Sequence, residues 1–407
     1  MQPAARLGST GASVTRRPRV VLLAHEIKAW GGMDMLLSEI IRHGHDRFDF
    51  VVVSTLLAED LRPLVAEWHR VRVPRRPFPL RFVSFWVLAG RLVDRLDADV
   101  VQATGAIVPG RVDVIGVYHC HRAYRAVWFS PGAPLTRRLN TMATRFAGAL
   151  AERWCYRSSR VRTLTCISGG LQADLEQYFP GVPSLLVSPG VDSSLFRPMP
   201  EIRAKRIADE GGPPARMLVA FVGGDWHRKG LDIALMGLAE AVRRGADVSM
   251  WVAGRHDEGW FRELPASLGV AERVRFLGSP KEVAPVYQAA DVFLLPSSYE
   301  TFSLPAHEAA ACGLPVVATA VHGVSALVGD NVAGMVIERD ASAVADALVK
   351  LWADPDLRER LGREGRQRAR TLTWASYAKG MLALYQDLMA AGVPTPVGDR
   401  STAPVTE

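Results

Sequence analysis

Two glutamates, Glu300 and Glu308, flank a segment that the sequence predicts to be a helix N-terminus. The apolar run 292–295 before them predicts a buried strand, and the run after them is alanine-rich. Ligands of open parallel sheets bind beyond the carboxyl ends of the strands, where helix N-termini attract phosphate. Glu308 is then suited to a vicinal diol such as ribose, and Glu300 to a sugar hydroxyl. Spacing alone equally allows Glu300 as a helix cap and Glu308 as a solvated helix residue. The backbone N–H groups expected at the phosphate belong to Thr301, Phe302, Ser303 and Leu304.

Residues 296–316 read PSSYETFSLPAHEAAACGLPV. This segment resembles the E-x7-E signature of the GT-B glycosyltransferases, especially retaining family 4, usually written P-S-x-x-E-G-F-G-L-P-x-x-E-A-x-A-x-G-x-P-V. Thr301 and Ser303 stand where the family has glycines. The resemblance implies the GT-B fold, in which two Rossmann-like domains face each other across a cleft. It also implies transfer of a hexose, with retention, from a UDP- or GDP-linked sugar to a glycan or glycolipid hydroxyl.

A second cluster lies in residues 221–230, FVGGDWHRKG, where a strand ends in Gly-Gly and two cations precede the next helix. A leaving diphosphate needs cationic partners, which favours Arg228 and Lys229 as diphosphate ligands over two solvated charges. The chain has only six lysines, so Lys229 stands out. The loop resembles that of lipopolysaccharide-core glucosyltransferases, G-S-D-F-x-R-K-G, in which an arginine at the Arg228 position replaces the one usual after the first glycine. This likeness favours a cell-envelope acceptor.

The resemblance extends to two weaker segments. It implies that Gly31 and Gly32 approach the donor diphosphate from the opposite domain, with Asp34 binding the acceptor or capping the next helix. It implies that the strand end 274–278 holds the base, with Arg275 and Leu277 beside it, although these residues could equally form only a strand and a turn.

The segment 117–122, VYHCHR, follows a predicted strand. In the family a catalytic-site histidine commonly lies here, which implies a role for His119, with His121 as the alternative, beside Lys229 and Glu300. A His-x-His pair also raises the possibility of a metal site, but a third ligand is missing nearby and Cys120 points the other way along a strand. The sequence lacks a clear Asp-x-Asp motif. We therefore expect no metal and no cofactor besides the donor substrate.

Charge is uneven along the chain. Residues 1–200 contain 26 Lys and Arg against 16 Asp and Glu, whereas the remainder contains 23 against 26. A basic half suits an anionic partner. Within it, Arg75, Arg76 and Arg81 lie among phenylalanines and a tryptophan, a pattern compatible with an anionic membrane surface, with an acceptor groove, or with a helix whose aromatics are core. A nucleic-acid partner is not expected, because no recognition motif accompanies the charge.

The elements that must position these residues follow from the alternation of apolar strand runs and helical patterns in each half, which predicts two doubly wound α/β domains with parallel sheets. Proline and glycine punctuate residues 188–200, as expected for a linker. We predict an acceptor domain over 1–190, a nucleotide-sugar domain over 191–373, a helix over 374–391 that packs back toward the first domain, and a disordered tail over 392–407.

The sequence has no apolar run of 18 residues, and it lacks the succession of basic, apolar and small residues that is typical of a signal peptide. Its four cysteines form no C-x-x-C pair. We expect a cytoplasmic protein with reduced thiols, and contact with the inner face of the cytoplasmic membrane is an alternative that the sequence leaves open. Two alternatives remain: another enzyme on this fold, such as a nucleotide-sugar epimerase or glycan phosphorylase, and a non-catalytic glycan- or lipid-binding protein. The intact Glu300/Glu308 pair argues against the second.

Overall fold

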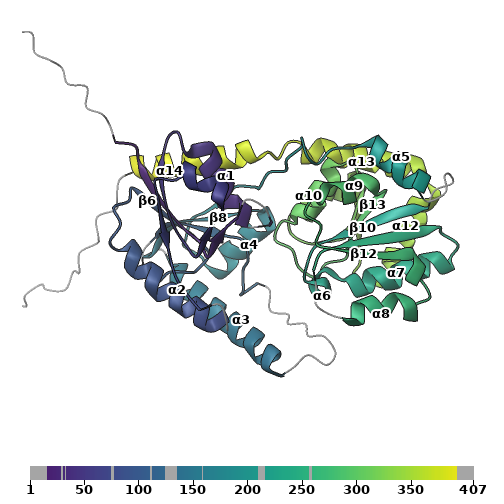
Figure 1. The fold of residues 1–407 in the computed structure, drawn as a ribbon, viewed down its shortest axis with the longest axis horizontal. Helices are drawn as coiled ribbons and strands as arrows, with labels where there is room; N and C mark the ends of the chain where they lie inside the picture. The colour runs from purple at the N-terminus through teal and green to yellow at the C-terminus, as the bar shows by residue number, and fades with distance from the viewer. Residues whose placement is uncertain are drawn as a thin grey trace, which may run out of the picture.

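The chain folds into two α/β domains that lie side by side (Figure 1). The computed structural model describes residues 16–28, 31–32, 34–74, 78–110, 112–123, 135–157, 159–209, 216–255 and 259–391. The first domain contains a parallel sheet in the order β5 (Glu67–Arg70), β3 (Asp49–Ser54), β1 (Arg19–Leu23), β6 (Val100–Thr104), β7 (Val112–Val117), β8 (Val161–Cys166) and β9 (Ser184–Leu186). Its helices are α1 (Asp34–Gly44), α2 (Phe78–Val93), α3 (Leu135–Cys155) and α4 (Gly169–Tyr178). Two short strands, β2 (Glu26–Ile27) and β4 (Leu56–Leu57), pair separately, and a 3-10 helix spans Glu59–Leu64.

The second domain repeats this plan. Its parallel sheet has the order β12 (Val274–Gly278), β11 (Val248–Ala253), β10 (Met217–Val222), β13 (Val292–Leu295), β14 (Val316–Thr319) and β15 (Gly334–Ile337). Its longer helices are α5 (Pro200–Asp209), α7 (Leu231–Arg243), α8 (Gly259–Ser267), α12 (Ala341–Ala353) and α13 (Pro355–Ala369). Its shorter helices are α6 (Trp226–Lys229), α9 (Ala284–Ala289), α10 (Leu304–Ala311) and α11 (Val324–Val332), with a 3-10 turn over Ala271–Arg273. The prediction of two doubly wound domains is confirmed.

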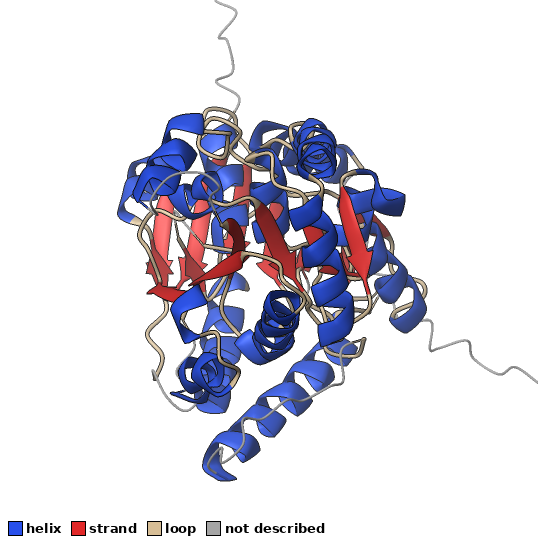
Figure 2. Cartoon of the chain, turned by 90° about the vertical axis from the view of Figure 1, so that its right-hand side faces the viewer, coloured by secondary structure: helices blue, strands red, loops and turns tan. Residues whose placement is uncertain are grey.

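Both sheets lie between layers of helices (Figure 2). A strand covered on both faces must be apolar on both sides, and all six residues of β10 are buried. In each sheet the order of the strands reverses beside the central strand, between β1 and β6 in the first and between β10 and β13 in the second. Ligands of open α/β sheets bind beyond the carboxyl ends of the strands at such a point. The loops of interest therefore follow these four strands.

Residues 341–369 form two consecutive helices, α12 and α13. Asp354 caps α13 by accepting a hydrogen bond from the backbone N–H of Leu357, and Pro355 occupies the first helical position, where a missing N–H costs nothing. The chain turns at this point, so α12 can pack on α7 and α13 on α10 and α11.

The last described helix, α14 (Trp374–Ala390), returns to the first domain (Figure 1). Met381, Leu382 and Tyr385 are buried in that domain's core, and the Tyr385 hydroxyl bonds the side-chain oxygen of Gln102 on β6. The chain thus crosses between the domains twice. The predicted tail over 392–407 lies outside the described residues.

Candidate active site

The loop after β10 places a lysine against a glycine. Gly223 has φ of +135°, a region that favours glycine, and a Cβ added there would lie 2.4 Å from Cε of Lys229. The next turn, α6, bears Lys229 at its end. Gly230 follows with φ of +74°, and a Cβ on it would lie 2.3 Å from the carbonyl oxygen of Pro296. These glycines let Lys229 lie across the carboxyl end of β10 against the loop after β13.

Lys229 and Glu300 form a buried ion pair. The lysine Nζ lies 2.8 Å from Oε1 of Glu300, and each residue is less than a tenth exposed. The same carboxylate oxygen lies 3.0 Å from a guanidinium nitrogen of Arg228 and accepts a 3.1 Å hydrogen bond from Ser297. Burial acts to raise the pKa of Glu300, but the charges of Lys229 and Arg228 outweigh it and hold that pKa below its ordinary value. Glu300 is therefore ionised between two cations.

Arg228 ties the two loops of the second domain together. Its guanidinium contacts Asp225 at 3.0 Å and donates to the backbone carbonyl of Tyr299, while its own carbonyl accepts hydrogen bonds from Ser297 and Ser298. Because the residue bonds through both side chain and backbone, the Gly-Gly loop and the E-x7-E loop form one unit.

The first residue of α10 follows Ser303, as the sequence predicts. Ser303 occupies the N-cap with φ of +65°, where glycine is favoured, so the serine that replaces the family's glycine holds a strained backbone. The ring of Phe302 stacks on His307 at 4.0 Å, and Nδ1 of His307 lies 3.0 Å from the Ser303 carbonyl oxygen. The backbone of this turn is thereby fixed at the helix N-terminus.

Glu308 lies in the second turn of α10, partly buried, and its Oε2 accepts a 2.8 Å hydrogen bond from the hydroxyl of Tyr287. Burial raises the pKa of Glu308 to about 7, although the Tyr287 bond and the charge of Lys229 act in the opposite direction. A carboxyl group that titrates near neutral pH can either accept or donate a hydrogen bond.

The two domains meet at this loop. Oγ1 of Thr301 donates a 2.9 Å hydrogen bond to the carbonyl of Tyr118, and the hydroxyl of Tyr299 lies 3.5 Å from the backbone N of Cys120. The rings of His119 and Tyr299 stand edge to face with centroids 5.3 Å apart. The structure thus brings His119, from the first domain, next to the loop that carries Glu300.

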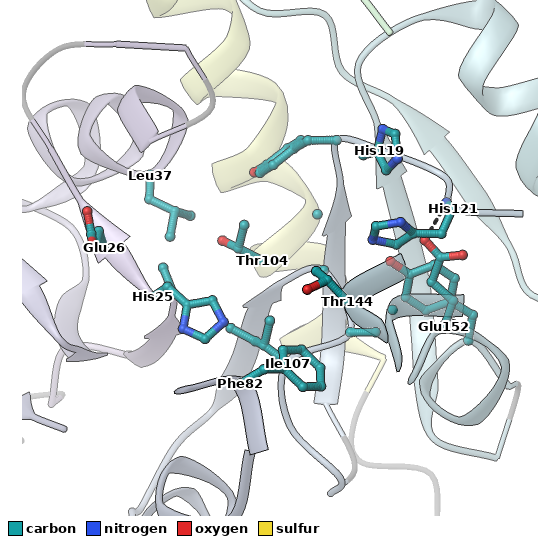
Figure 3. Close-up of a pocket in the computed structure, with 17 residues that line it drawn as sticks. His25, Glu26, Leu37, Phe82, Thr104, Ile107, His119, His121, Thr144 and Glu152 are labelled. Carbon is teal, nitrogen blue, oxygen red and sulfur yellow. Dashed lines mark hydrogen bonds between the residues drawn. The ribbon is translucent and has the colours of Figure 1, made fainter. Parts of the chain in front are cut away.

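His119 and His121 project near each other, with ring centroids 4.6 Å apart (Figure 3). Burial, together with the charges of His121, Arg145 and Arg228, lowers the pKa of His119 to about 3. The imidazole is therefore neutral at physiological pH. Among the described residues, no group of three or more His, Cys, Asp or Glu side chains is arranged to hold a metal ion.

A cavity of about 290 Å³ opens in the first domain beyond the ends of β1, β6 and β7 (Figure 3). Its walls come from His25 and Thr104 on the strand ends, from Phe82 on α2, and from Gly148 and Glu152 on α3. The lining also includes His119 and His121, so the cavity reaches the junction of the domains. This cavity can hold a substrate next to the residues that follow β13.

Other predicted residues are less close to the site. Arg275 lies over the Trp251 ring at 5.8 Å and lines a hollow with Arg216 and Asp247, which precede β10 and β11. That hollow is at the opposite end of the strands from Lys229, so the structure does not bring Arg275 to the predicted base site. Only Leu277 lies near the carboxyl end of β12.

In the first domain, Gly31 and Gly32 are exposed with φ of +94° and +42°, and a Cβ on either would meet nothing within 4 Å. Asp34 begins α1, but its side chain is outside the described part of the structure, as are Arg75 and Arg76 altogether. Arg81 pairs with Glu26 at 2.6 Å beside the cavity.

Of the aromatics near these arginines, Phe85 is fully buried, and Phe82 and Trp86 pack against the core. The sequence left three alternatives open for this segment. These three residues fit the alternative of a helix whose aromatics belong to the core. These three side chains therefore contribute to the packing of the first domain.

Two contacts had no clear signal in the sequence. Tyr299 is an unspecified position of the motif, yet it contacts the His119 loop. His322 reaches across the domains to Asp174, with Nε2 and Oδ2 3.1 Å apart, and packs where Gly170 leaves room, since a Cβ there would lie 2.1 Å from its ring. Both depend on pairing between distant segments.

Comparison with known families divides the chain in the same way as the fold. Residues 30–195 match the family described as Glycosyltransferase Family 4, and residues 216–354 match the family described as Glycosyl transferases group 1. The chain therefore combines a domain of Glycosyltransferase Family 4 with a domain of Glycosyl transferases group 1. Both matches together span most of the described residues, and the second includes the whole E-x7-E loop.

Curated relatives include the D-inositol 3-phosphate glycosyltransferases of Segniliparus rotundus, 36% identical over 234 residues, and of Corynebacterium efficiens, 33% identical over 239 residues. These alignments cover 55% and 54% of this chain, and 51% and 56% of the relatives, so the chain spans about half the length of the curated relatives it matches.

Solved structures share the fold. WaaG, a glycosyltransferase involved in lipopolysaccharide biosynthesis, superposes with a TM-score of 0.75 at 21% identity, covering 90% of this chain and 99% of WaaG. Sucrose-phosphate synthase from Thermosynechococcus elongatus gives 0.72 at 20% identity, covering 92% and 100%. Anabaena HepE in complex with UDP and glucose gives 0.67 at 17% identity, covering 91% and 100%. At these identities the likeness establishes the GT-B fold alone.

Proposed function

We propose that this protein is a retaining glycosyltransferase that moves a hexose from a nucleotide-diphosphate sugar to a hydroxyl group of a glycan or glycolipid. The observation that carries the proposal is the buried Lys229–Glu300 pair, held beside the N-terminus of α10 and opposite His119. Lys229 can bind the diphosphate at one end of the bond that is cleaved, and Glu300 can bind a hydroxyl group of the sugar at the other end.

In this proposal the donor diphosphate binds Arg228, Lys229 and the backbone N–H groups of residues 301–304, with Gly31 and Gly32 closing from the first domain. Glu308 holds the ribose, and Glu300 holds the hexose. A protein with the same fold, HepE, has been solved with UDP and with UDP-glucose, which favours UDP as the nucleotide to test first.

Cleavage of the sugar–phosphate bond places negative charge on the leaving diphosphate. Lys229 and Arg228 are already in place to stabilise that charge, so little reorganisation is needed at the moment of reaction. We propose that this cationic pair takes the role of a metal ion and that transfer needs none. The acceptor hydroxyl attacks from the same face as the departing diphosphate and gives its proton to the leaving phosphate oxygen, which preserves the anomeric configuration.

The acceptor is proposed to bind in the cavity of the first domain. His119 borders that cavity and the Glu300 loop, and as a neutral imidazole it can accept a hydrogen bond from a sugar hydroxyl. Curated relatives are named D-inositol 3-phosphate glycosyltransferases, and one structural relative acts in lipopolysaccharide biosynthesis. Polyols and cell-envelope glycolipids are therefore the first acceptors to test.

We further propose that the protein works in the cytoplasm and touches the inner face of the cytoplasmic membrane. The excess of cations in the first 200 residues supports an anionic surface as partner. Among the described residues, no helix combines the length and hydrophobicity needed to span a bilayer.

The test is direct transfer. The purified chain is incubated with UDP- and GDP-sugars and an acceptor panel, with and without EDTA. Nucleotide release measures turnover, and NMR of the product gives the anomeric configuration. Lys229→Ala and Glu300→Ala should each lower transfer by at least a hundredfold, on the scale of losing one preorganised group at a developing charge. Lys350→Ala, an exposed lysine on α12, is the matched control.

Full transfer by both site variants would refute the assignment of the donor site. Product formed without an acceptor would indicate an epimerase, and a requirement for inorganic phosphate would indicate a phosphorylase. Inhibition by EDTA that added Mg²⁺ or Mn²⁺ reverses would contradict metal-independent transfer.

A further inference from the structure

The outer side of α3 is a continuous apolar stripe. Large hydrophobic side chains are exposed at intervals of three or four residues, which places them on one side of the helix. They extend about 28 Å along its axis. Phe146 is 69% exposed and Leu135 is 70% exposed, values unusual for such side chains in a folded domain. The stripe consists of Leu135, Leu139, Met142, Phe146, Leu150 and Trp154.

Helix α2 extends this surface. The two helices contact each other and project together from the first domain (Figure 1). Exposed apolar side chains also follow one side of α2, at Leu80, Val83, Val87 and Leu88. More than half of the chain's exposed large hydrophobic residues, among those the structure describes, thus belong to these two helices. Contiguous apolar patches of this kind mark interaction sites.

The charges of the same helices have one sign. The sequence of α2 contains two arginines and no acidic residue. That of α3 contains four arginines and a single acid, Glu152, which is buried and faces inward. A helix surface that combines leucine, phenylalanine and tryptophan with arginine, and lacks exposed acids, fits the interface of an anionic bilayer. Self-association would instead bring like charges together.

The opposite side of α3 lines the proposed acceptor cavity. Thr144, Gly148 and Glu152 follow one another at intervals of four residues and line that cavity. Figure 3 shows Thr144 and Glu152 at its wall. On α2, Phe82 faces it as well. The two helices therefore separate the cavity from the exposed apolar surface by the thickness of a single helix layer.

We propose that the outer face of α2 and α3 docks on an anionic phospholipid membrane, and that the acceptor is a lipid-anchored molecule whose head group enters the cavity between these helices. The assignment of the acceptor rests on the proposed glycosyltransferase function, whereas the docking surface does not. Replacement of two stripe residues removes apolar contact with the lipid. Replacement of one arginine should lower the affinity for an anionic membrane about fivefold.

The experiment is co-sedimentation of the full chain with two kinds of vesicle, one of phosphatidylcholine alone and one of phosphatidylcholine with phosphatidylglycerol. The wild-type chain should bind the second kind only. Leu139→Ser with Phe146→Ser should weaken binding at least tenfold, and Arg138→Gln with Arg153→Gln about 25-fold. The matched control is Met236→Ser with Trp352→Ser, since both residues are 39% exposed but lie on the second domain.

Three outcomes would overturn the proposal. The first is equal vesicle binding by the stripe variant and the wild type. The second is binding that ignores the anionic lipid. The third is a wild-type dimer in analytical ultracentrifugation that the stripe variant dissociates without any vesicle binding, which would make a second copy the occupant.

Transfer assays separate the two hypotheses. The stripe variant should keep full transfer to a water-soluble acceptor and lose transfer to the same glycan on a lipid in vesicles. Equal transfer to both acceptors by the stripe variant would refute the proposal that docking of this face delivers a lipid-anchored acceptor to the cavity. If the wild type binds vesicles but transfers nothing to any acceptor, the proposed function fails while the docking surface stands.

Discussion

The pairing of Lys229 with Glu300 can be measured by a double-mutant cycle of Lys229→Met, Glu300→Gln and the combined variant. Removal of one member of a buried pair leaves the other charge uncompensated, at a typical cost of 3–5 kcal/mol. Here Arg228 and Ser297 also contact Glu300, so Lys229→Met should fall at the low end, about 3 kcal/mol. Glu300→Gln should lower the free energy of unfolding by a similar amount, because it leaves Lys229 and Arg228 beside a neutral amide.

The combined variant should be destabilised by about 4 kcal/mol rather than the sum of the two, which gives a coupling of roughly 2 kcal/mol. Because a two-domain chain need not unfold in one step, unfolding of the second domain should be followed separately. Urea titration read by hydrogen exchange of peptides from β10 and β13 does this. The matched control pair is Glu240 with Arg244 at the exposed C-terminal end of α7, where solvent screens both charges and the coupling should be far smaller.

The same pair predicts a pH dependence. The pKa of Glu300 is held below its ordinary value of 4.5, so its ion pairs stabilise the fold at pH values above that value. This stabilisation is lost as the pH falls through the lowered pKa, and the wild type and Glu300→Gln should then converge in stability. Additive costs at neutral pH, or no convergence in acid, would refute direct pairing in the folded protein.

Three other variants follow from single contacts. Gly223→Ala should reduce UDP affinity at least tenfold, because the new Cβ displaces Lys229; calorimetry measures this, and unchanged affinity would contradict the close approach. The raised pKa of Glu308 makes the folded state bind a proton more tightly than the unfolded state, so the wild type should lose stability between about pH 4.5 and 7. Glu308→Gln should abolish this decline in the free energy of unfolding. An unaltered pH profile would show that this carboxyl titrates normally. Tyr385→Phe should cost about 1–2 kcal/mol in thermal unfolding, because it removes a buried bond to Gln102; no loss of stability would mean that water replaces the hydroxyl.

The spacing of apolar residues and the positions of proline and glycine were sufficient to predict the two domains, because alternating strands and helices leave few ways to bury both faces of a sheet. The helix start after Ser303 was equally accessible, since it follows from an apolar strand, a turn and an alanine-rich run. The pairing of Lys229 with Glu300 was not, since it joins residues 71 positions apart and depends on how two loops meet.

Other features depend on packing that no local pattern encodes. The sequence placed Arg275 at the base site, but a side chain near the start of a strand lies at the wrong end of the sheet, over Trp251. The sequence pattern indicated the aromatic residues of 78–86 as a surface feature but gave no signal for Phe146 on α3, which is exposed. Whether an amphipathic helix turns its apolar side inward is decided by what the rest of the chain covers.

The return of α14 has a mechanical consequence. The two segments that connect the domains run together, because the backbone N–H of Val191 bonds the carbonyl of Leu372. They are in such close contact that a Cβ on Gly190 would lie 2.1 Å from the backbone N of Trp374. Two connections joined at one point resist sliding of one domain past the other, because both covalent segments would have to move together. Rotation of the domains about this point would have to break the hydrogen bond between Thr301 and Tyr118 and the contact between His322 and Asp174. The junction thus acts as a pivot, and these contacts across the domains hold His119 beside Tyr299.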